Sequence, residues 1–237
     1  DTLKQWQMEE IPHKQYLNDY FTGKYPGSES RGELYNDDPV TKDARFCGTT
    51  ASMCGIESAG FEQDKEKMEK AVRKDLMLHA YMFMQAGIPM IYSGDEIGQL
   101  NDYSYKENPE KAADSRYIHR GKFNWELAKN RKLPHTVQGK LFPALDNLEH
   151  IRRTHSVFDS DADVRTIDTW DPSILAVVRE NTMEKFIGIY NFSEYDKVAW
   201  INEEDGTYVD LISGREMEAK GVQIPAYGCF WLCREKK

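Results

Sequence analysis

The feature that most constrains the fold is a short apolar run, residues 88–92, which lies between Gly87 and Gly94. Its length and its glycine boundaries predict a buried strand. Apolar side chains recur at helical spacing over residues 64–86, which predicts an amphipathic helix directly ahead of that strand. A helix, a short buried strand and an acidic, glycine-rich loop in this order are typical of an α/β barrel, in which the loop after the strand carries chemistry.

Sequence patterns divide the rest of the chain into three segments. Residues 1–62 are predicted to be loop-rich with short helices, and residues 22–48 are dominated by turn residues. A loop of this length is usually functional or disordered, and its aromatic residues and two arginines favour function. Residues 63–157 hold the helix and strand, a long polar loop at 94–136 and a second amphipathic helix from about 136 to 154. After residue 158 the apolar period changes from 3.6 to 2, which predicts an antiparallel β-sandwich domain over 158–237. The predicted strands are 174–178, 186–190, 198–201, 208–211, 222–224 and 229–232.

Charge and hydropathy exclude two kinds of partner. The formal net charge of −9 argues against a nucleic-acid surface, because phosphates require clustered Lys and Arg. No apolar run approaches the roughly 20 residues that cross a bilayer, so no membrane association is predicted. The chain begins at Asp1 without a methionine, and we expect it to be a processed or trimmed piece of a longer protein.

The cysteines and histidines show no ligand pattern, so no metal and no cofactor is predicted. Cys229 and Cys233 are four residues apart on a predicted strand, a spacing of roughly 13 Å that is too long for a disulfide. We interpret all four cysteines as reduced packing residues, which favours a cytoplasmic protein. His79 lies near the apolar face of the first helix and is predicted to be a packed core residue.

Several stretches resemble the C-terminal part of α-amylase-superfamily enzymes, most closely the amylosucrase branch. The arginine-glycine loop at 27–49 follows the amylosucrase pattern, and the Gly-x-Pro-x-Ile-Tyr-x-Gly-Asp-Glu run at 87–96 occurs widely in the superfamily. Residues 100–102 and 114–120 (Asp-Ser-Arg-Tyr-x-His-Arg) point to amylosucrases more narrowly. The Asn-Phe-Ser turn at 191–193 and Pro225-x-Tyr227 resemble the β domain of the same enzymes. The sequence departs from the amylosucrase pattern at three positions, where an arginine, an asparagine and a glycine are replaced: Lys14, Asp38 and Lys42.

The resemblance implies retaining cleavage of α-glucosides. In that chemistry one carboxylate attacks the anomeric carbon and a second carboxylic acid protonates the leaving oxygen. The sequence holds none of the superfamily motifs that carry these groups, so no catalytic residue is predicted in it. The resemblance therefore implies an α/β plus all-β chain: a remnant of a (β/α)8 barrel (its last helix and strand, with a long inter-strand insert) followed by an antiparallel β-sandwich domain. On this interpretation the isolated chain is inactive.

Four residues are candidate substrate-binding groups by resemblance. Arg116, with Asp114 beside it, is implied to pair with an acid from the missing half and close the glucose pocket; the alternative is a surface salt bridge. Arg45 is implied to contact the sugar on the leaving-group side, or else to hold its own loop together. Lys14 is a weaker candidate, because lysine does not replace arginine at a bidentate contact. A further pair, Asp95 and Glu96, follows the predicted strand; here we favour Glu96 accepting loop amide hydrogens and holding Asp95 in a turn.

Two functions from different classes follow. The first is the C-terminal segment of a glycosidase or glucosyltransferase that acts on α-glucosides such as sucrose or on α-glucans, with the missing N-terminal barrel half as its partner. The second is a non-catalytic carbohydrate-binding or interaction module. Because the predicted barrel remnant would expose the apolar face of residues 64–92, self-association is also expected.

Overall fold

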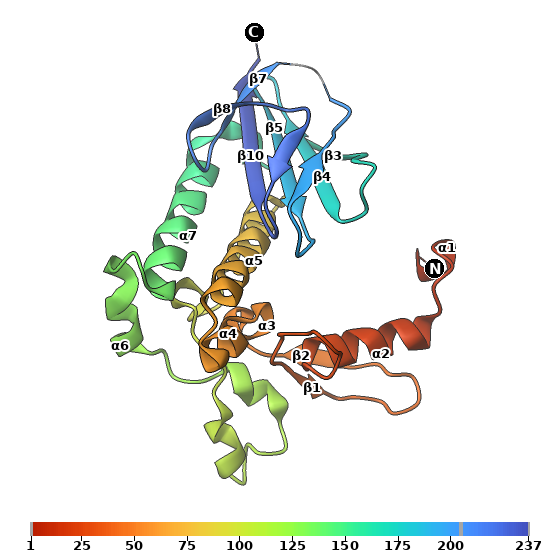
Figure 1. Cartoon of the computed structure of the whole chain (residues 1–237), viewed down its shortest axis with the longest axis vertical. Helices are drawn as coiled ribbons and strands as arrows, with labels where there is room; N and C mark the ends of the chain where they lie inside the picture. The colour runs from red at the N-terminus through yellow and green to blue at the C-terminus, as the bar shows by residue number, and fades with distance from the viewer. Residues whose placement is uncertain (1, 204–205, 237) are drawn as a thin grey trace. The chain divides into compact units, whose positions relative to one another are not determined.

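The computed structural model of the protein describes residues 2–203 and 206–236, which form two compact units (Figure 1). Unit 1 comprises Asp1–Val72 and Tyr92–Lys132, and unit 2 comprises Arg73–Ile91 and Leu133–Lys237. Helix α5 (Lys65–Met84) contributes residues to both units. Each unit draws on more than one of the segments 1–62, 63–157 and 158–237, and that three-segment division stays a prediction.

Unit 1 consists of short helices, 3-10 turns and one hairpin. Strands β1 (Glu33–Tyr35) and β2 (Arg45–Cys47) pair antiparallel inside the stretch that the sequence indicates only as turns. Cys47 of β2 packs with Tyr105 and Ile118 in a small buried core. The other elements are α1 (Thr2–Gln5), α2 (Glu10–Phe21), α3 (Thr50–Cys54), α4 (Ile56–Glu62), η1 (Asp95–Ile97), η2 (Tyr103–Glu107), η3 (Ser115–His119), α6 (Trp125–Ala128) and η4 (Lys129–Lys132).

Both predicted long helices are present. The first is α5, and the second is α7 (Val137–Thr154), which begins where the Oγ1 atom of Thr136 accepts a 3.0 Å hydrogen bond from the Gly139 amide. This side-chain cap satisfies one of the backbone N–H groups that the first helical turn leaves without a partner. His79 of α5 is buried as predicted, with its Nδ1 atom 2.9 Å from Oδ1 of Asp75.

The predicted antiparallel strands are confirmed. Six strands form one sheet in the order β3-β4-β5-β10-β7-β8, and β6 pairs with β9 in a second sheet. The sequence pattern missed β3 and β8, the two edge strands, because most of their side chains are exposed and polar. The strands are β3 (Asp163–Ile167), β4 (Ile174–Glu180), β5 (Glu184–Asn191), β6 (Lys197–Ala199), β7 (Thr207–Asp210), β8 (Arg215–Glu218), β9 (Val222–Ile224) and β10 (Cys229–Glu235).

The six-stranded sheet carries a separate apolar core on each face. On one face, Trp231, Phe186 and Tyr190 pack against buried residues of α5 and α7 and against η5 (Ser156–Phe158). On the other face, alternate residues of β4 and β5 pack against the small β6–β9 sheet. The alternation follows from the strand geometry, in which successive side chains point to opposite faces. The sheet is therefore buried on both sides at its centre.

The predicted strand at 88–92 is wrong. These residues form no helix or strand, and the side chains of Ile88 and Met90 are 92% and 80% exposed. A buried strand needs neighbours on both edges to receive its backbone N–H and C=O groups. No strand among the described residues pairs with this segment, so its apolar side chains face solvent. The described residues therefore do not show the strand of the predicted barrel remnant.

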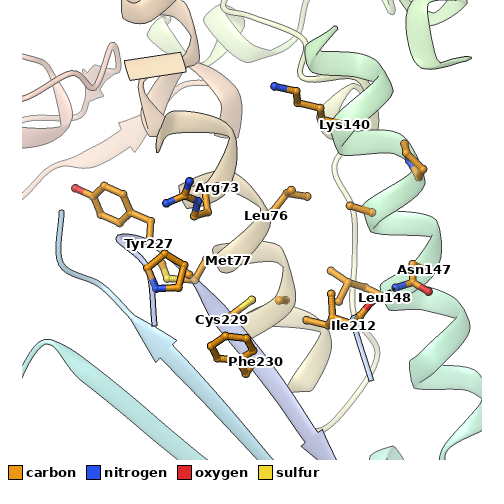
Figure 2. Close-up of a pocket in the computed structure, with 15 residues that line it drawn as sticks. Arg73, Leu76, Met77, Lys140, Asn147, Leu148, Ile212, Tyr227, Cys229 and Phe230 are labelled. Atoms are coloured by element: carbon orange, nitrogen blue, oxygen red, sulfur yellow. Dashed lines mark hydrogen bonds between the residues drawn. The ribbon is translucent and has the colours of Figure 1, made fainter. Parts of the chain in front are cut away.

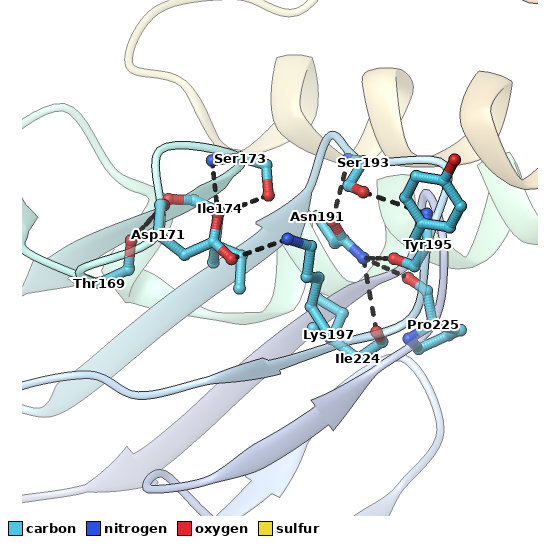
Figure 3. Close-up of polar contacts among 10 residues, drawn as sticks. All are labelled: Thr169, Asp171, Ser173, Ile174, Asn191, Ser193, Tyr195, Lys197, Ile224 and Pro225. Atoms are coloured by element: carbon cyan, nitrogen blue, oxygen red, sulfur yellow. Dashed lines mark hydrogen bonds and ion pairs between the residues drawn. The ribbon is translucent and has the colours of Figure 1, made fainter.

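Side-chain hydrogen bonds connect the turns of unit 2, including two stretches that the resemblance singles out (Figure 3). The buried Asn191 donates from Nδ2 to the carbonyls of Tyr195 and Pro225, at 2.8 and 3.0 Å. The Tyr227 amide donates to the Ser193 carbonyl at 3.1 Å. The Asn-Phe-Ser turn and the approach to β10 thus hold each other in place.

Over the part of the chain that the structure describes, we find no helix both long and apolar enough to cross a membrane. All four cysteines lie in that part, and no disulfide joins any of them. Three of the four are buried, as the prediction of packing residues requires.

Candidate sugar-contacting site

The candidate site of unit 1 is centred on an ion pair between Arg116 and Asp114. The guanidinium donates from Nε to Oδ1 at 2.9 Å and from its terminal nitrogen to Oδ2 at 2.8 Å. This fork-to-fork geometry fixes the plane of the guanidinium as well as its charge. Asp114 also caps η3, because its Oδ1 atom accepts the Arg116 amide at 3.0 Å. The two residues that the resemblance places together are therefore one rigid, half-buried group.

Tyr35 of strand β1 supports this group from the hairpin. The Arg116 guanidinium lies 4.2 Å from the centre of the Tyr35 ring, an arrangement that favours cation–π attraction. Arg45 lies directly opposite Tyr35 in the β1–β2 register, so the two side chains share one face of the hairpin. The structure thus brings Arg45 to the neighbourhood of Arg116 and Asp114. Tyr35 was missed by the sequence, because its hairpin was not predicted.

Lys14 belongs to a different part of unit 1. Its ammonium pairs with Asp43 and with Glu10, each at 2.6 Å, and these contacts raise the pKa of Lys14, with the hydrogen bond to Asp43 as the largest cause. Asp43 follows Lys42, whose φ of 60° lies in the left-handed region. The resemblance has a glycine at this position, and glycine adopts that conformation without strain. Lys42 therefore adopts a conformation that favours glycine.

Asn101 joins the separate stretches of the resemblance. Its side-chain Oδ1 atom accepts the Thr49 backbone amide at 2.9 Å, and its backbone amide donates to the Ser52 hydroxyl at 2.9 Å. Its Nδ2 atom donates to the Arg31 carbonyl. Because one side chain binds both ends of the arginine-glycine loop, residues 27–49 and 100–102 form a single piece. The resemblance names these two stretches separately, and the sequence did not predict that they are hydrogen-bonded to each other.

The two acidic residues that follow residue 92 hold their own loop in place. The Glu96 carboxylate accepts the Gly94 amide at 2.8 Å, and Asp95 lies buried in the η1 turn, as the sequence interpretation favours. His119 of η3 stacks edge-on against Tyr92, with ring centres 5.6 Å apart. Burial, with a smaller effect from the Arg120 charge, lowers the pKa of His119. This shift favours the uncharged imidazole of His119, which lies in the same 3-10 turn as Arg116.

A cavity of about 580 Å³ lies in unit 2, where α5, α7 and residues 225–230 surround it (Figure 2). Leu76, Met77 and Phe230 give it an apolar surface, and none of the described residues that line it is a carboxylate. A sugar hydroxyl that loses water without a new hydrogen-bond partner is costly to bury. The cavity lining offers few such partners, with Arg73, Lys140 and Asn147 as its charged or amide side chains.

The Asp114–Arg116 pair gives a pH prediction. The hydrogen bonds from Arg116 lower the pKa of Asp114 from 3.8 to about 2. A carboxyl with a lowered folded-state pKa stabilises the fold above about pH 4, and that contribution is lost as the pH falls through about 2. In Arg116→Leu, the pKa of Asp114 is expected to return towards 3.8, as followed by carboxyl 13C chemical shifts. Asp171, whose pKa is also about 2 but depends on Ser173 and Lys197, serves as the internal control and should not move.

Comparison with known proteins shows similarity to much longer enzymes. No family model matches the chain. It is 26% identical over 166 residues to the glucosylglycerate phosphorylase of Escherichia coli (strain K12), which covers 69% of this chain and 29% of that protein. The chain thus spans less than a third of the length of this curated relative.

Two solved structures share the fold at low sequence identity. AmyP in complex with maltose matches 69% of this chain and 35% of its own, with a TM-score of 0.57 and 16% identity. A mutant of trehalulose synthase MutB from Pseudomonas mesoacidophila MX-45, in complex with its substrate sucrose, matches 68% of this chain and 38% of its own, with a TM-score of 0.53 and 18% identity. At this level of identity the solved structures show the fold alone, and none of these similarities identifies the amylosucrase branch.

Proposed function

We propose that this chain is the C-terminal segment of an α-amylase-superfamily enzyme that transfers or hydrolyses the glucosyl group of an α-glucoside with retention. The observation that carries the proposal is the similarity to glucosylglycerate phosphorylase over 69% of the chain. The interlocked loops of unit 1 support it, because the stretches that resemble the superfamily are joined by hydrogen bonds that the backbone and side chain of one residue, Asn101, donate and accept.

The proposed reaction is a double displacement. A carboxylate attacks the anomeric carbon, a carboxylic acid protonates the leaving oxygen, and the glucosyl-enzyme then reacts with an acceptor. Since the sequence holds none of the motifs that carry these two groups, we place them on a barrel half outside these 237 residues. The acceptor is water, another sugar or, given the name of the curated relative, phosphate. How well the pocket excludes water decides between hydrolysis and transfer.

We assign the contacts on the sugar to the Arg116 group. A guanidinium has five N–H donors, of which Asp114 takes two, so three remain for sugar hydroxyls or for an acid of the missing half. Arg45, on the same face of the hairpin as Tyr35, is proposed to reach the leaving-group side. Lys14 is proposed only as a distal contact, because Asp43 and Glu10 already neutralise its charge.

The exposed segment at 88–92 supports a missing partner. Ile88 and Met90 are large apolar side chains that face solvent, two residues apart in a segment without helix or strand. Packing them against a barrel half would remove this surface from water, which is favourable by about 25 cal/mol per Å². The same surface can drive self-association of the isolated chain, and light scattering at increasing concentration measures that.

An activity assay tests the proposal. The complete gene product that contains these residues is incubated with sucrose, other α-glucosides and glucosylglycerate, each with and without phosphate. We expect release of reducing sugar or glucose phosphate with retention of the α configuration, followed by NMR, whereas the isolated 237-residue chain shows no turnover. If the complete product acts on no α-glucoside, the proposal is wrong.

A non-catalytic module is the second candidate, and the exposed apolar segment at 88–92 favours it equally as an interaction surface. Isothermal titration of the isolated chain with maltooligosaccharides distinguishes the two functions. Measurable binding by the isolated chain favours a carbohydrate-binding module, and its absence favours a segment that needs the barrel half. In either case we propose a cytoplasmic location, which the absence of disulfides among the four described cysteines supports.

A further inference from the structure

Unit 2 contains a cluster of potential metal ligands that lies outside the candidate sugar site. His155, Glu184 and Cys233 each offer one ligand atom, and the three atoms lie within 4.8 Å of one another. They come from three elements: His155 is the C-cap of α7, Glu184 begins β5, and Cys233 lies in β10. Imidazole, carboxylate and thiolate together are a set that zinc accepts.

The sheet register makes this meeting a fixed feature of the fold. Cys233 pairs with Phe186 and Glu235 pairs with Glu184, so Cys233 and Glu184 are diagonal neighbours on one face of the sheet. That face carries the core to which α7 contributes Leu148 and Ile151, and His155 ends this helix. The three side chains are therefore positioned by packed elements and not by a loose loop.

The distances suit a metal ion after small movements. His155 Nδ1 lies 2.5 Å from Glu184 Oε1, and Cys233 Sγ lies 4.0 Å from the same oxygen. Tetrahedral Zn²⁺ with its usual bond lengths would set these separations at about 3.4 and 3.6 Å. One distance must widen by about 0.9 Å and the other must shorten by about 0.4 Å, within the reach of side-chain rotation.

The second oxygen of Glu184 is held in place independently. Its Oε2 atom accepts the Ser156 hydroxyl and the Val157 amide, both at 3.0 Å. Asn181 in turn donates to the Ser156 hydroxyl at 3.0 Å. Partners of this kind orient a metal-binding carboxylate and are worth about 10–100-fold in metal affinity. Oε1 is thereby presented to His155 and Cys233.

We propose that Nδ1 of His155, Oε1 of Glu184 and Sγ of Cys233 bind a Zn²⁺ ion, with water as the fourth ligand. On binding, the thiol loses its proton to solvent and forms the Zn–S bond, and the proton of the imidazole moves from Nδ1 to Nε2. Burial raises the pKa of the Cys233 thiol to about 12 in the absence of metal, so the ion must displace this proton. The side chain of His155 is 29% exposed, which leaves a path for water and the ion.

Cobalt substitution tests the site directly. The 237-residue chain, reduced with a phosphine and freed of metal by a chelator, is titrated with Co²⁺ and then with Zn²⁺. We expect one equivalent of Co²⁺ to give a thiolate-to-cobalt charge-transfer band together with visible tetrahedral bands, all of which Zn²⁺ abolishes. Zn²⁺ is also expected to raise the Tm, because it binds the folded chain.

Three variants identify the ligands. Cys233→Ala should lose the charge-transfer band, and His155→Gln, which changes a half-buried side chain outside the core, should weaken Co²⁺ binding at least about 10-fold. Cys229→Ala, four residues earlier in the same strand, is the matched control and should bind Co²⁺ like the original chain. The proposal is overturned if no thiolate band forms, or if the band persists in Cys233→Ala. Should Cys233→Ala not fold, unchanged affinity and an unchanged zinc-dependent rise in Tm in His155→Gln overturn it equally.

Discussion

Replacing Arg179 by methionine is expected to lower the free energy of unfolding of the chain by about 3–5 kcal/mol. Arg179 is fully buried in β4 and donates to three backbone carbonyls: Val157 and Asp159 at 2.8 Å and Met84 at 3.1 Å. Burial, and then the nearby Arg152 charge, lowers the pKa of its guanidinium. Methionine keeps much of the volume but removes the side-chain donor from these carbonyls. The Asp159 carbonyl keeps the Ala162 amide as a donor at 3.3 Å, and each carbonyl left unpaired costs about 1–3 kcal/mol. Urea unfolding followed by tryptophan fluorescence measures the loss.

Two further variants show whether the hydrogen bonds cause this loss. Arg179→Lys keeps the positive charge, but a single ammonium cannot reproduce the planar fork that reaches three carbonyls, so most of the loss should remain. Arg153→Met, on the exposed side of α7 with a 3.6 Å ion pair to Glu149, should change stability by no more than about 0.5 kcal/mol. A loss below about 1 kcal/mol in Arg179→Met would mean that the three carbonyls find other donors.

Arg179 also illustrates what periodicity cannot predict. The sequence predicts a strand at 174–178, which stops before the charged pair Arg179 and Glu180. In the structure β4 continues through both, since the carbonyls that end α5 and form η5 provide acceptors for a buried guanidinium. Those acceptors lie 95 and 22 residues away in sequence and are brought together only by the tertiary fold.

For the other elements too, local spacing predicts what it records, and contacts made by the tertiary fold escape it. Helices α5 and α7 and the central strands were predictable, because an amphipathic face and its burial are recorded in local spacing. The segment at 88–92 has the composition of a strand, but a strand forms only beside a partner, which no described residue provides. The edge strands β3 and β8 form beside partners despite having no apolar pattern.

The two candidate sites differ in how far apart their residues lie in the sequence. Asp114 and Arg116 are two residues apart, so their pairing is local, although the resemblance implied an acid of the missing half as the partner of Arg116. His155, Glu184 and Cys233 are separated by 29 and 49 residues, and their meeting depends on strand register and on where α7 ends. Histidine spacing along the chain therefore gave no sign of a metal site.

Arg116→Lys is expected to reduce kcat/KM of the complete enzyme on its α-glucoside by about 100-fold. Lysine retains the charge but cannot make the two parallel bonds to Asp114, so its donors are no longer held in the plane that the guanidinium fixes beside the Tyr35 ring. A loss of positioning of about 1 Å at a substrate contact is enough for an effect of this size. Initial rates at several substrate concentrations, with the Tm of each variant measured alongside, provide the test.

The size of the rate effect relative to stability decides the role of Arg116. The Asp114–Arg116 pair is partly exposed, so its removal should change the Tm little, whereas a positioning role predicts a large fall in rate at unchanged Tm. Arg131→Lys is the matched control: Arg131 is an exposed arginine of unit 1 whose guanidinium donates to the Ala128 carbonyl at 2.9 Å, and its replacement should leave kcat/KM within about twofold. If Arg116→Lys also stays within twofold, the ion pair only braces η3, and the sugar contacts of unit 1 must come from Arg45 or from groups outside the candidate site.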